Sequence, residues 1–340
     1  MVNEKFIQNF TALISKEKQA TSPNTFRIRS YQKIVKIIAE LKKEIISSDD
    51  VAGIPGIGAK TIEKINTILE KGQLDGLDLT SHQQSNNYQT SNDLESVTGI
   101  GAVKAKKLIE SGWTLEKLRA RFAEDPSSLE SVLTHHQRLG IKYYADLENR
   151  IPYAEIQEIE KYIAKRLEWI NKKYYTENEY QFQICGSFRR KKETSGDIDI
   201  LFYNSKQSGL DEDFLGKLLG RFKTLGFIKD SLTDKKITTK YMGFCKLTKT
   251  KFARRIDMRC IDRESFPCAL LYFTGSGEFN KNMRSFANRK GYTINEYGVF
   301  KLKADGSKGK SIPMSFEEDI FTLLGKEYIA PENRLATVKF

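Results

Sequence analysis

The sequence is poor in the sulfur and nitrogen ligands that hold metals, and it contains no long apolar run. Its 340 residues include four cysteines and three histidines. No two cysteines form a CxxC pair, which favours buried or free thiols in a reducing compartment. The first residues, MVNEKFIQNF, carry an acid early and lack the apolar core of a signal peptide or membrane span. We therefore expect an intracellular protein without a membrane partner.

Positive charge is in excess, with a formal net charge of +12. This balance favours a polyanionic partner, with nucleic acid first, although composition alone leaves acidic membranes and acidic proteins open. The length suggests two or three domains with sizeable cores.

The pattern of apolar residues changes along the chain. Helical periodicity runs from Phe6 to about Glu70 and resumes after a polar stretch, Leu79 to Asp93, until about Lys173. Short alternating runs typical of strands follow from Tyr180: YQFQIC, DIDILF, KYMGFCKL and RRIDMRC. The chain is therefore expected to have a helical N-terminal half and an α+β C-terminal half.

One internal repeat is present in the helical half. VAGIPGIGAKTIEKI, 51–65, matches ESVTGIGAVKAKKLI, 95–109, and each copy places GIG before a lysine-rich helix. Glycines allow a tight turn that points successive N–H groups at a phosphate from a helix N-terminus. The repeat resembles the helix-hairpin-helix motif, which grips DNA without reading sequence. A simple turn between two helices is the alternative for either copy alone.

The stretch GSFRRKKETSGDIDILF, 186–202, places two acids on one side of a predicted strand. Side chains at i and i+2 point the same way, so Asp197 and Asp199 project together. RRIDMR supplies a third acid, Asp257, again between apolar neighbours. Grouped carboxylates repel one another unless a cation lies between them, and Mg²⁺ prefers such oxygens together with those of phosphates. An edge strand with solvated acids is the alternative, which the preceding Gly186 and Ser187 disfavour.

Longer motifs point to a family. Gly-Ser followed by Asp-x-Asp marks a wide nucleotidyltransferase superfamily. LYFTGSGEFNKNMR, GYTINEYGVF, HHQRLGIKYYADLENRIP and RRIDMR resemble the family X DNA polymerases, closely those of the DNA polymerase beta type. The resemblance runs from about Thr25 to the C-terminus. It implies a multidomain α and α+β fold, with a helical lyase-like domain carrying helix-hairpin-helix motifs, then a nucleotidyltransferase palm with fingers and thumb subdomains.

The resemblance and the composition together suggest five segments. They are a lyase-like domain with the first hairpin (1–78), a polar linker (79–93), a helical DNA-binding subdomain with the second hairpin (94–152), a catalytic palm (153–264) and a nucleotide-selection subdomain (265–340). Few residues precede Thr25, so we expect no BRCT-like domain there.

The resemblance implies roles for residues of the C-terminal half. Asp197 and Asp199 would bind two Mg²⁺ ions, for which Mn²⁺ could substitute, and Asp257 would bind the catalytic ion and help to take the primer hydroxyl proton. The residues expected to bind the nucleotide are Arg150, Ser187, Arg190, Gly196, Tyr272, Phe273, Gly275 and Asn280. Lys281 and Arg284 would meet the template strand, and Arg259 and Glu296 would take part in a closing switch. A core position for Phe273 and a purely structural Arg259–Glu296 ion pair are the alternatives.

Three features depart from the family pattern. Gly277 stands where the family often has an acid, which puts a contact near the incoming base in doubt. The chain is longer by several residues between Ile151 and Gly186. The run Arg189–Lys192 is enriched in charge, and half or more of that charge is expected to belong to a solvated turn.

The helical N-terminal half matches the family's 5′-deoxyribose phosphate lyase. Lys64 occupies the place of the nucleophile, which must be neutral to form a Schiff base, and nearby cations lower the pKa of such an amine. Lys60 and Arg27 would supply these cations and bind the 5′-phosphate, with Tyr31 nearby. Phe26 and Arg27 replace a His-Lys pair, and Gly76 replaces a lysine. An ordinary exposed helix lysine is the alternative for Lys64.

The two hairpins are also expected to bind DNA and cations. Their glycines, Gly56, Gly58, Gly99 and Gly101, would approach the DNA backbone. The resemblance implies Na⁺ or K⁺ at backbone carbonyls, near Ala52, Ile54 and Ile57 in the first hairpin and near Glu95, Val97 and Ile100 in the second.

The sequence therefore predicts a template-directed, gap-filling DNA polymerase of base excision repair with lyase activity. Its expected partners are gapped or nicked double-stranded DNA and dNTPs, and it is expected to be a monomer, in the nucleus of a eukaryotic cell or in the cytoplasm or virion if viral. Repair proteins are further partners that the sequence does not specify. The alternatives are a template-independent terminal transferase, which the short stretch between Asp199 and Asp257 disfavours, and a DNA-binding scaffold without activity.

Overall fold

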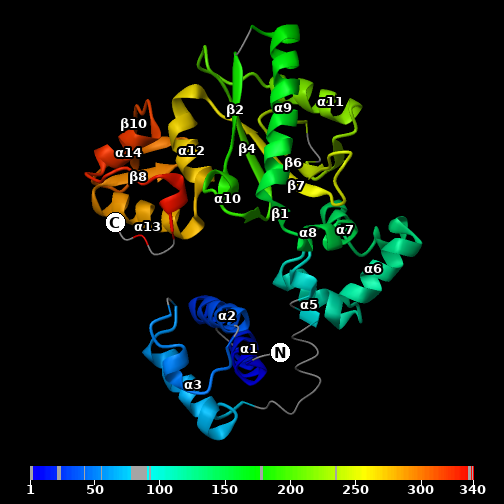
Figure 1. Cartoon of the computed structure of the whole chain (residues 1–340), viewed down its shortest axis with the longest axis vertical. Helices are drawn as coiled ribbons and strands as arrows, with labels where there is room; N and C mark the ends of the chain where they lie inside the picture. The colour runs from blue at the N-terminus through cyan, green and yellow to red at the C-terminus, as the bar shows by residue number, and fades with distance from the viewer. Residues whose placement is uncertain are drawn as a thin grey trace. The chain divides into compact units, whose positions relative to one another are not determined.

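The computed structural model describes residues 3–20, 24–41, 43–54, 56–77, 90–91, 93–176, 179–233, 236–335, 338 and 340. The chain forms two compact units, residues 1–132 and 133–340 (Figure 1). Residues 79–89 and 92 of the predicted linker lie outside the described residues. None of the helices in the described ranges is both long and apolar enough to cross a membrane.

The first unit is helical, as predicted. Its elements are α1 (Glu4–Gln19), α2 (Thr25–Glu40), the 3₁₀ helix η1 (Ser48–Asp50), α3 (Ala59–Lys71), α5 (Ala102–Glu110), α6 (Leu115–Glu124) and η2 (Pro126–Leu129). Apolar residues spaced by three and four bury one face of each of the first three helices in a shared core. Asn24 begins α2 by accepting hydrogen bonds from the backbone N–H groups of Phe26 and Arg27, each at 3.1 Å.

The two GIG turns have the same backbone geometry. Gly56 and Gly99 adopt positive φ angles of 108° and 89°, which glycine tolerates without strain. Gly58 and Gly101 are the N-caps of α3 and α5, with φ and ψ of −103° and 174° in one and −95° and 174° in the other. Each turn is closed by one hydrogen bond, from Ile57 N to Ile54 O at 2.9 Å and from Ile100 N to Val97 O at 3.0 Å. The sequence repeat is therefore a structural repeat.

The second unit contains three sheets. It begins with α7 (His135–Lys142), α8 (Tyr144–Glu148), β1 (Ile151–Pro152) and α9 (Tyr153–Tyr174). The central part comprises β2 (Tyr180–Ile184), α10 (Gly186–Arg189), β3 (Thr194–Ser195), β4 (Ile198–Asn204), α11 (Phe214–Thr224), β5 (Ile228–Ser231), β6 (Lys240–Cys245) and β7 (Arg254–Cys260). The C-terminal part comprises η3 (Arg263–Ser265), α12 (Phe266–Thr274), α13 (Gly277–Arg289), β8 (Tyr292–Asn295), β9 (Gly298–Leu302), β10 (Lys308–Ile312), α14 (Glu317–Leu323) and η4 (Pro331–Asn333). All four predicted strand runs are strands.

The main sheet has the strand order β2-β4-β7-β6-β5, in which only β4 and β7 pair in parallel. One face carries Ile198, Ile200, Ile256 and Met258, which form a core with α9 and α11. On β4 the opposite face carries Leu201, which packs with Ala269 of α12. Figure 1 shows α9 and α11 on one side of this sheet and α12 on the other. The sheet therefore separates the α9–α11 layer from the face that carries the acids.

The C-terminal part has a core of its own. β8, β9 and β10 form an antiparallel sheet, and buried residues of α12, α13 and α14 pack beside it. The four cysteines are buried and free, and burial raises the pKa of each thiol. The expectation of buried thiols holds.

Candidate active site

The three acids singled out in the sequence lie on one face of the main sheet. Asp199 is directly opposite Asp257 in the parallel pairing of β4 with β7. Asp197 immediately precedes β4, two residues before Asp199, so both carboxylates project away from the core formed by Ile198 and Ile200. Alternation on two neighbouring strands therefore brings together side chains that are about sixty residues apart in sequence.

The acids strongly influence one another. Burial and the charges of Asp197 and Asp257 raise the pKa of Asp199 to about 7. Desolvation and the charge of Asp257 also raise the pKa of Asp197. Arg255 opposes both shifts, as does Arg190 at Asp199 and Arg150 at Asp197, but the net direction is upward for both carboxyls. The neighbouring arginines therefore offset the desolvation and mutual repulsion of the acids only in part.

Arg255 holds the third acid. Its Nε and a terminal nitrogen donate to the two carboxylate oxygens of Asp257 at 2.7 and 3.1 Å. Within the described parts of the chain, no three His, Cys, Asp or Glu side chains are already arranged as a metal cage. The donor set still fits Mg²⁺, because it groups carboxylate oxygens on one face of the sheet. Asp257 would exchange Arg255 for the ion. Sequence reasoning missed Arg255, although the same i, i+2 rule places it beside Asp257.

The turn before β4 lies against the acids. Gly186 has a φ of 58°, and a Cβ there would lie 3.1 Å from Asp199 Oδ2. Ser187 follows on the short helix α10. Arg150 donates to Thr194 Oγ1 at 2.8 Å and to the Thr194 carbonyl at 3.0 Å, and its guanidinium lies 3.8 Å from where a Cβ would stand on Gly196. Small residues thus leave the acids and the cations accessible to a ligand.

Arg190 reaches the loop between α12 and α13. Its guanidinium donates to the Thr274 carbonyl, and a Cβ on Gly275 would lie 3.1 Å from the same nitrogen. Gly275 has a φ of 70°, which disfavours any other residue. The predicted triphosphate and sugar contacts, Arg190 and Gly275, are therefore neighbours.

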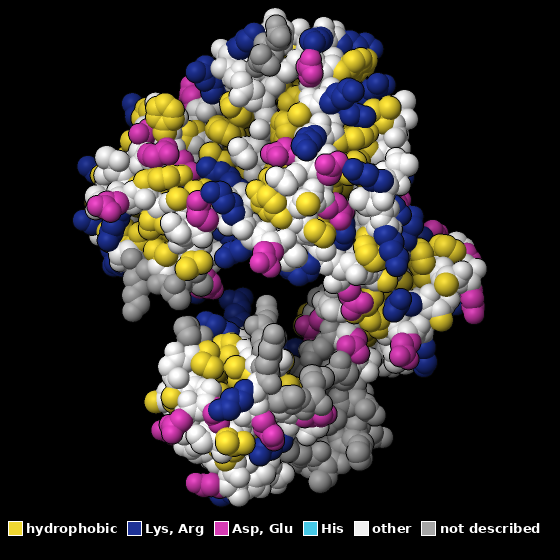
Figure 2. Space-filling model, in the orientation of Figure 1, with side chains coloured by type: hydrophobic (Ala, Val, Ile, Leu, Met, Phe, Trp, Pro, Cys, Tyr) yellow, Lys and Arg dark blue, Asp and Glu magenta, His cyan; other side chains and the backbone are white. Residues whose placement is uncertain are grey.

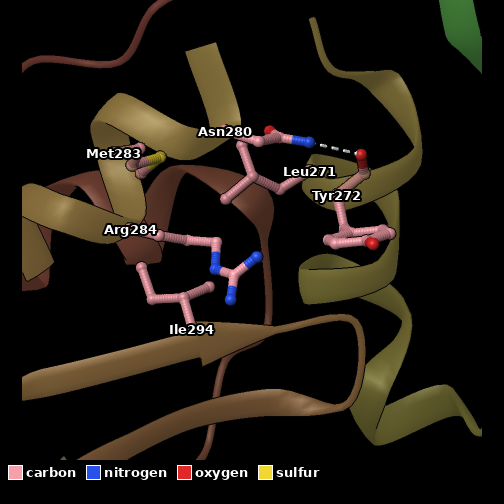
Figure 3. A pocket seen from close by; sticks show the side chains of 6 residues that line it. All are labelled: Leu271, Tyr272, Asn280, Met283, Arg284 and Ile294. Atoms are coloured by element: carbon pink, nitrogen blue, oxygen red, sulfur yellow. Dashed lines mark hydrogen bonds between the residues drawn. The ribbon is translucent and has the colours of Figure 1, made fainter. Parts of the chain in front are cut away.

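A shallow pocket opens beside this loop (Figure 3). Asn280 of α13 donates its side-chain amide to the Tyr272 carbonyl at 2.7 Å, and Arg284 lies one turn further along the same helix. Leu271, Met283 and Ile294 supply apolar walls. Three residues predicted from the sequence, Tyr272, Asn280 and Arg284, thus line one pocket.

The residues of the predicted switch are also in contact. Arg259 lies 3.8 Å from Glu296, between a terminal nitrogen and Oε1, and its guanidinium carbon is 5.1 Å from the centre of the Phe273 ring. Phe273 packs against the small core of Leu201 and Ala269. Lys281 pairs only loosely with Glu278, at 3.8 Å on an exposed surface, so it is accessible to a partner.

Four family models match successive parts of this chain. They are a helix-hairpin-helix domain (1–74), the fingers domain of DNA polymerase lambda (92–148), the DNA polymerase beta palm (150–263) and the DNA polymerase beta thumb (269–335). The chain belongs to the family X DNA polymerases. It is similar to DNA polymerase lambda of Rattus norvegicus, with 31% identity over 319 residues, 91% of this chain and 52% of the relative. DNA polymerase lambda of Arabidopsis thaliana is 30% identical over 326 residues, 90% of this chain and 57% of the relative. The chain thus spans little more than half the length of these relatives.

Family membership confirms the predicted multidomain fold, and the three acids lie within the segment that matches the palm model. Within the run Arg189–Lys192 of this family X palm, Lys191 and Lys192 are exposed, as expected for half of its charge. Arg189 instead donates to Thr274 Oγ1 at 2.7 Å and to both oxygens of Glu317 at 3.1 and 2.9 Å. Arg334, fully buried, donates to the same Glu317 at 2.6 Å. These partners lie more than eighty residues from Arg189, so no local pattern in the sequence could reveal the network.

The lyase candidates of this family X chain lie on α2 and α3. Lys64 is half-buried, and the exposed Lys60 precedes it by one turn. Arg27 pairs with Glu17 at the long distance of 3.8 Å and remains exposed, and Phe26 is 80% exposed, so both are accessible to a ligand. Tyr31 instead packs toward Phe10, with ring centroids 6.1 Å apart.

A cation lies beside Gly76 even though a lysine is missing there. Lys16 donates its ammonium to the Gly76 carbonyl at 3.1 Å and would lie 3.5 Å from a Cβ on that glycine. Lys16 lies 60 residues before Gly76, so the sequence alone does not show that its ammonium takes the place of the missing lysine.

Proposed function

We propose that this family X chain is a template-directed DNA polymerase that fills short gaps in base excision repair. The observation that carries the proposal is the pairing of Asp199 with Asp257 across parallel strands, with Asp197 beside them. The raised pKa of Asp199, which burial and the charges of Asp197 and Asp257 cause, supports a site where a divalent cation would stabilise the carboxylates. The names of the two relatives support DNA synthesis as the activity.

The acids would divide the chemistry between them. Asp197 and Asp199 would hold two Mg²⁺ ions, and Asp257 one of them; when bound, the ions would activate the primer hydroxyl and stabilise charge on the phosphates. Asp257 would also help to accept the proton of the primer 3′-OH. Release of Asp257 from Arg255 would accompany this step.

The neighbouring residues would hold the nucleotide. Arg150, Ser187 and Arg190 would bind the triphosphate, because guanidinium groups match phosphate oxygens in pairs. Tyr272, Phe273 and Gly275 would border the sugar, and Asn280 would meet the base edge. Lys281 and Arg284 would contact the template strand. The direct neighbours Arg190 and Gly275 support this assignment.

The first unit would add lyase activity. Lys64 would attack the aldehyde of a 5′-deoxyribose phosphate, with Lys60 and Arg27 on its phosphate. The position of Lys64 one turn after Lys60, on the helix that follows the first GIG turn, supports this assignment. The ammonium of Lys16 provides a further cation in the same unit.

The two GIG turns would grip the DNA backbone through the N–H groups at the starts of α3 and α5. Ile54 and Val97 occupy the same place in each turn, and each carbonyl accepts one hydrogen bond, which leaves a second lone pair for Na⁺ or K⁺. Gapped DNA and dNTPs would be the partners of a monomeric protein in the nucleus or, for a virus, in the cytoplasm or virion. The five-segment division remains a prediction.

The test is incorporation opposite a one-nucleotide gap with Mg²⁺. The unaltered protein is expected to add the templated nucleotide, and Asp257→Ala is expected to lose nearly all incorporation while it keeps binding to gapped DNA. Binding is read by anisotropy of the same labelled substrate, which separates a chemical defect from a folding defect. Addition without a template would favour a terminal transferase, and no incorporation with Mg²⁺ or Mn²⁺ would favour a DNA-binding scaffold.

A further inference from the structure

Aromatic and cationic side chains alternate along the outer surface of α9. Four of them follow the helical repeat at intervals of four, three and four residues, which places them on one face. We define the aromatic–cation stripe as these four residues together with one neighbour on α9 and one on α11: Tyr162, Arg166, Trp169, Lys173, Tyr174 and Arg221. Figure 2 shows Lys and Arg side chains gathered over the region of α9 and α11, with hydrophobic side chains among them.

Each cation of the stripe lies over a ring. The guanidinium carbon of Arg166 is 3.7 Å from the centre of the Tyr162 ring, and that of Arg221 is 4.6 Å from Trp169. The ammonium of Lys173 lies 4.7 Å from Trp169 and 5.0 Å from Tyr174. Two of the rings are accessible, since Trp169 is 37% and Tyr174 45% exposed, whereas the Tyr162 ring packs on the core beside Phe227. Such contacts pre-order the cations without neutralising them.

The three cations have no acidic partner within the described ranges. Among the described residues, no carboxylate lies within ion-pair distance of Arg166, Lys173 or Arg221. Arg221 Nε also has no hydrogen-bond partner there, although it is buried. The surrounding acids are engaged elsewhere: Glu168 pairs with Lys172 at 2.7 Å, and Asp211 accepts from Tyr175 at 2.5 Å. Glu212 and Asp213 immediately precede α11, more than two helical turns from Arg221.

The stripe lies behind the candidate active site. Buried residues of α9 and α11 pack on the sheet face that carries Ile198 and Met258, whereas Asp199 and Asp257 project from the other face. One layer of sheet therefore separates the stripe from the acids. A ligand on the stripe would not compete with a primer end at the acids.

We propose that the aromatic–cation stripe is a second binding surface, for single-stranded DNA, outside the site of nucleotide addition. Unpaired phosphate charges need cations, and unstacked bases need exposed aromatic faces, so this ligand uses both kinds of side chain at once. A duplex would leave Trp169 and Tyr174 without bases to stack on, since its bases already stack on one another. From Tyr162 to Lys173 the stripe extends about 16 Å along the helix, which is enough for several contacts in a row. Its function would be to hold an unpaired strand near the enzyme.

The test measures binding of a fluorescein-labelled oligo-dT by anisotropy, with saturating unlabelled gapped duplex and without dNTP or metal. The unaltered protein is expected to bind oligo-dT under these conditions, and Trp169→Ala with Tyr174→Ala is expected to weaken binding by about five-fold or more per ring. The matched control, Lys303→Ser with Lys310→Ser, alters two exposed cations on the β9–β10 hairpin and is expected to leave binding within two-fold. Trp169→Leu keeps an apolar side chain for packing and should fail like the alanine variant, which separates stacking from folding.

A second measurement uses the fluorescence of the stripe itself. The sequence has two tryptophans, so Trp113→Phe leaves Trp169 as the only reporter. Oligo-dT is expected to quench its emission, while poly-glutamate of equal charge is not. The proposal is overturned if oligo-dT binds equally well to the ring variants, or if the Lys303/Lys310 control loses as much. Equal quenching by poly-glutamate would also overturn it and would indicate an acidic protein partner. Because no incorporation is measured, these outcomes do not depend on the proposed polymerase activity.

Discussion

At the scale of single residues, Arg255 offsets part of the negative charge of the three acids. It binds both oxygens of Asp257, and its charge lowers the pKa values that burial and mutual repulsion raise at Asp197 and Asp199. The arginine would therefore compete with the proposed divalent cation for Asp257. Its side chain is only 15% exposed, so water replaces it poorly.

Arg255→Gln should reduce the Mg²⁺ concentration needed for half-maximal incorporation, because Asp257 no longer has to leave a guanidinium. In the absence of metal the same variant should melt at a lower temperature, since three acids then face one another with less compensation. A Mg²⁺ titration of gap filling and melting curves in EDTA and Mg²⁺ measure the two effects. An increased Mg²⁺ requirement would show that Arg255 supports the metal site instead of competing with it.

Gly275 and Gly277 differ in whether the surrounding structure has room for a side chain. A Cβ on Gly275 would lie 3.1 Å from Arg190, and the backbone at Gly275 has a positive φ that disfavours other residues. A Cβ on Gly277 would meet no atom within 4 Å. Gly275→Ala is expected to raise the KM for dNTP several-fold, because Arg190 is displaced and backbone strain of about 1 kcal/mol or more is introduced. Gly277→Ala should leave KM and the melting temperature unchanged. Steady-state kinetics of both variants decide this, and equal effects would refute the assignment of Arg190 and Gly275 to one contact.

The residues that could be predicted from sequence are those with local signals. Asp197, Asp199 and Asp257 follow from alternation with buried isoleucine and methionine, and the resemblance added the pocket residues Tyr272 and Asn280. Arg255 obeys the same alternation, but alternation alone does not show that its guanidinium binds Asp257. Lys16 could not be found, since only folding brings its ammonium to Gly76.

At the scale of elements, a buried charge network fastens α10 to α12 and α14. Glu317 accepts hydrogen bonds from Arg189 and Arg334. The side chain of Glu317 is 2% exposed, that of Arg189 17% and that of Arg334 0%. Burial alone would raise the pKa of Glu317, but the hydrogen bonds and charges of Arg334 and Arg189 lower it overall. The strands around this network were predictable from alternation, whereas the network joins residues from three helices and had no signal in the sequence.

Glu317→Gln is expected to destabilise the second unit by about 3–5 kcal/mol at neutral pH, because two buried guanidiniums lose their counter-charge. Because folding lowers the pKa of Glu317, its ion pairs stabilise the fold fully above the ordinary pKa of about 4.5. This stabilisation is lost as the pH falls through the lower pKa of the folded state. The difference between the unaltered protein and the variant should therefore be largest near neutrality and shrink in acid. Urea unfolding at about pH 7 and about pH 4 measures it. Glu318→Gln, at the exposed neighbouring position, is the control and should lose little.

At the scale of the whole molecule, the two compact units separate the two proposed activities. The predicted polymerase acids all lie in the second unit, and the predicted lyase lysine lies in the first. The composition predicted a nucleic-acid partner from the net charge of +12, and the repeat predicted two hairpins with one geometry. The boundary between the compact units, at residues 132 and 133, lies within the predicted 94–152 segment, because close packing and family resemblance divide a chain by different criteria.

Lys64→Ala is therefore expected to remove most Schiff-base trapping while primer extension stays near normal. Lys64 lies one turn after Lys60, so a 5′-phosphate held by Lys60 and by the N–H groups at the start of α3 would bring the aldehyde to its amine. Borohydride trapping of a labelled sugar-phosphate end measures the first activity, and extension across a gap without that end measures the second. Lys71→Ala, an exposed position near the end of the same helix that pairs with Asp75 at 3.0 Å, is the matched control and should trap normally.

Each result of that experiment has one structural meaning. Equal trapping by Lys64→Ala would move the nucleophile to another amine, with Lys60 the nearest on the same helix face. No trapping by the unaltered protein would mean that Phe26 and Gly76 mark a lost lyase, and that Lys16 and Lys60 only anchor a 5′-phosphate. Loss of primer extension in Lys64→Ala would contradict the separation itself, because none of the acids on β4 and β7 lies in the unit that contains α3.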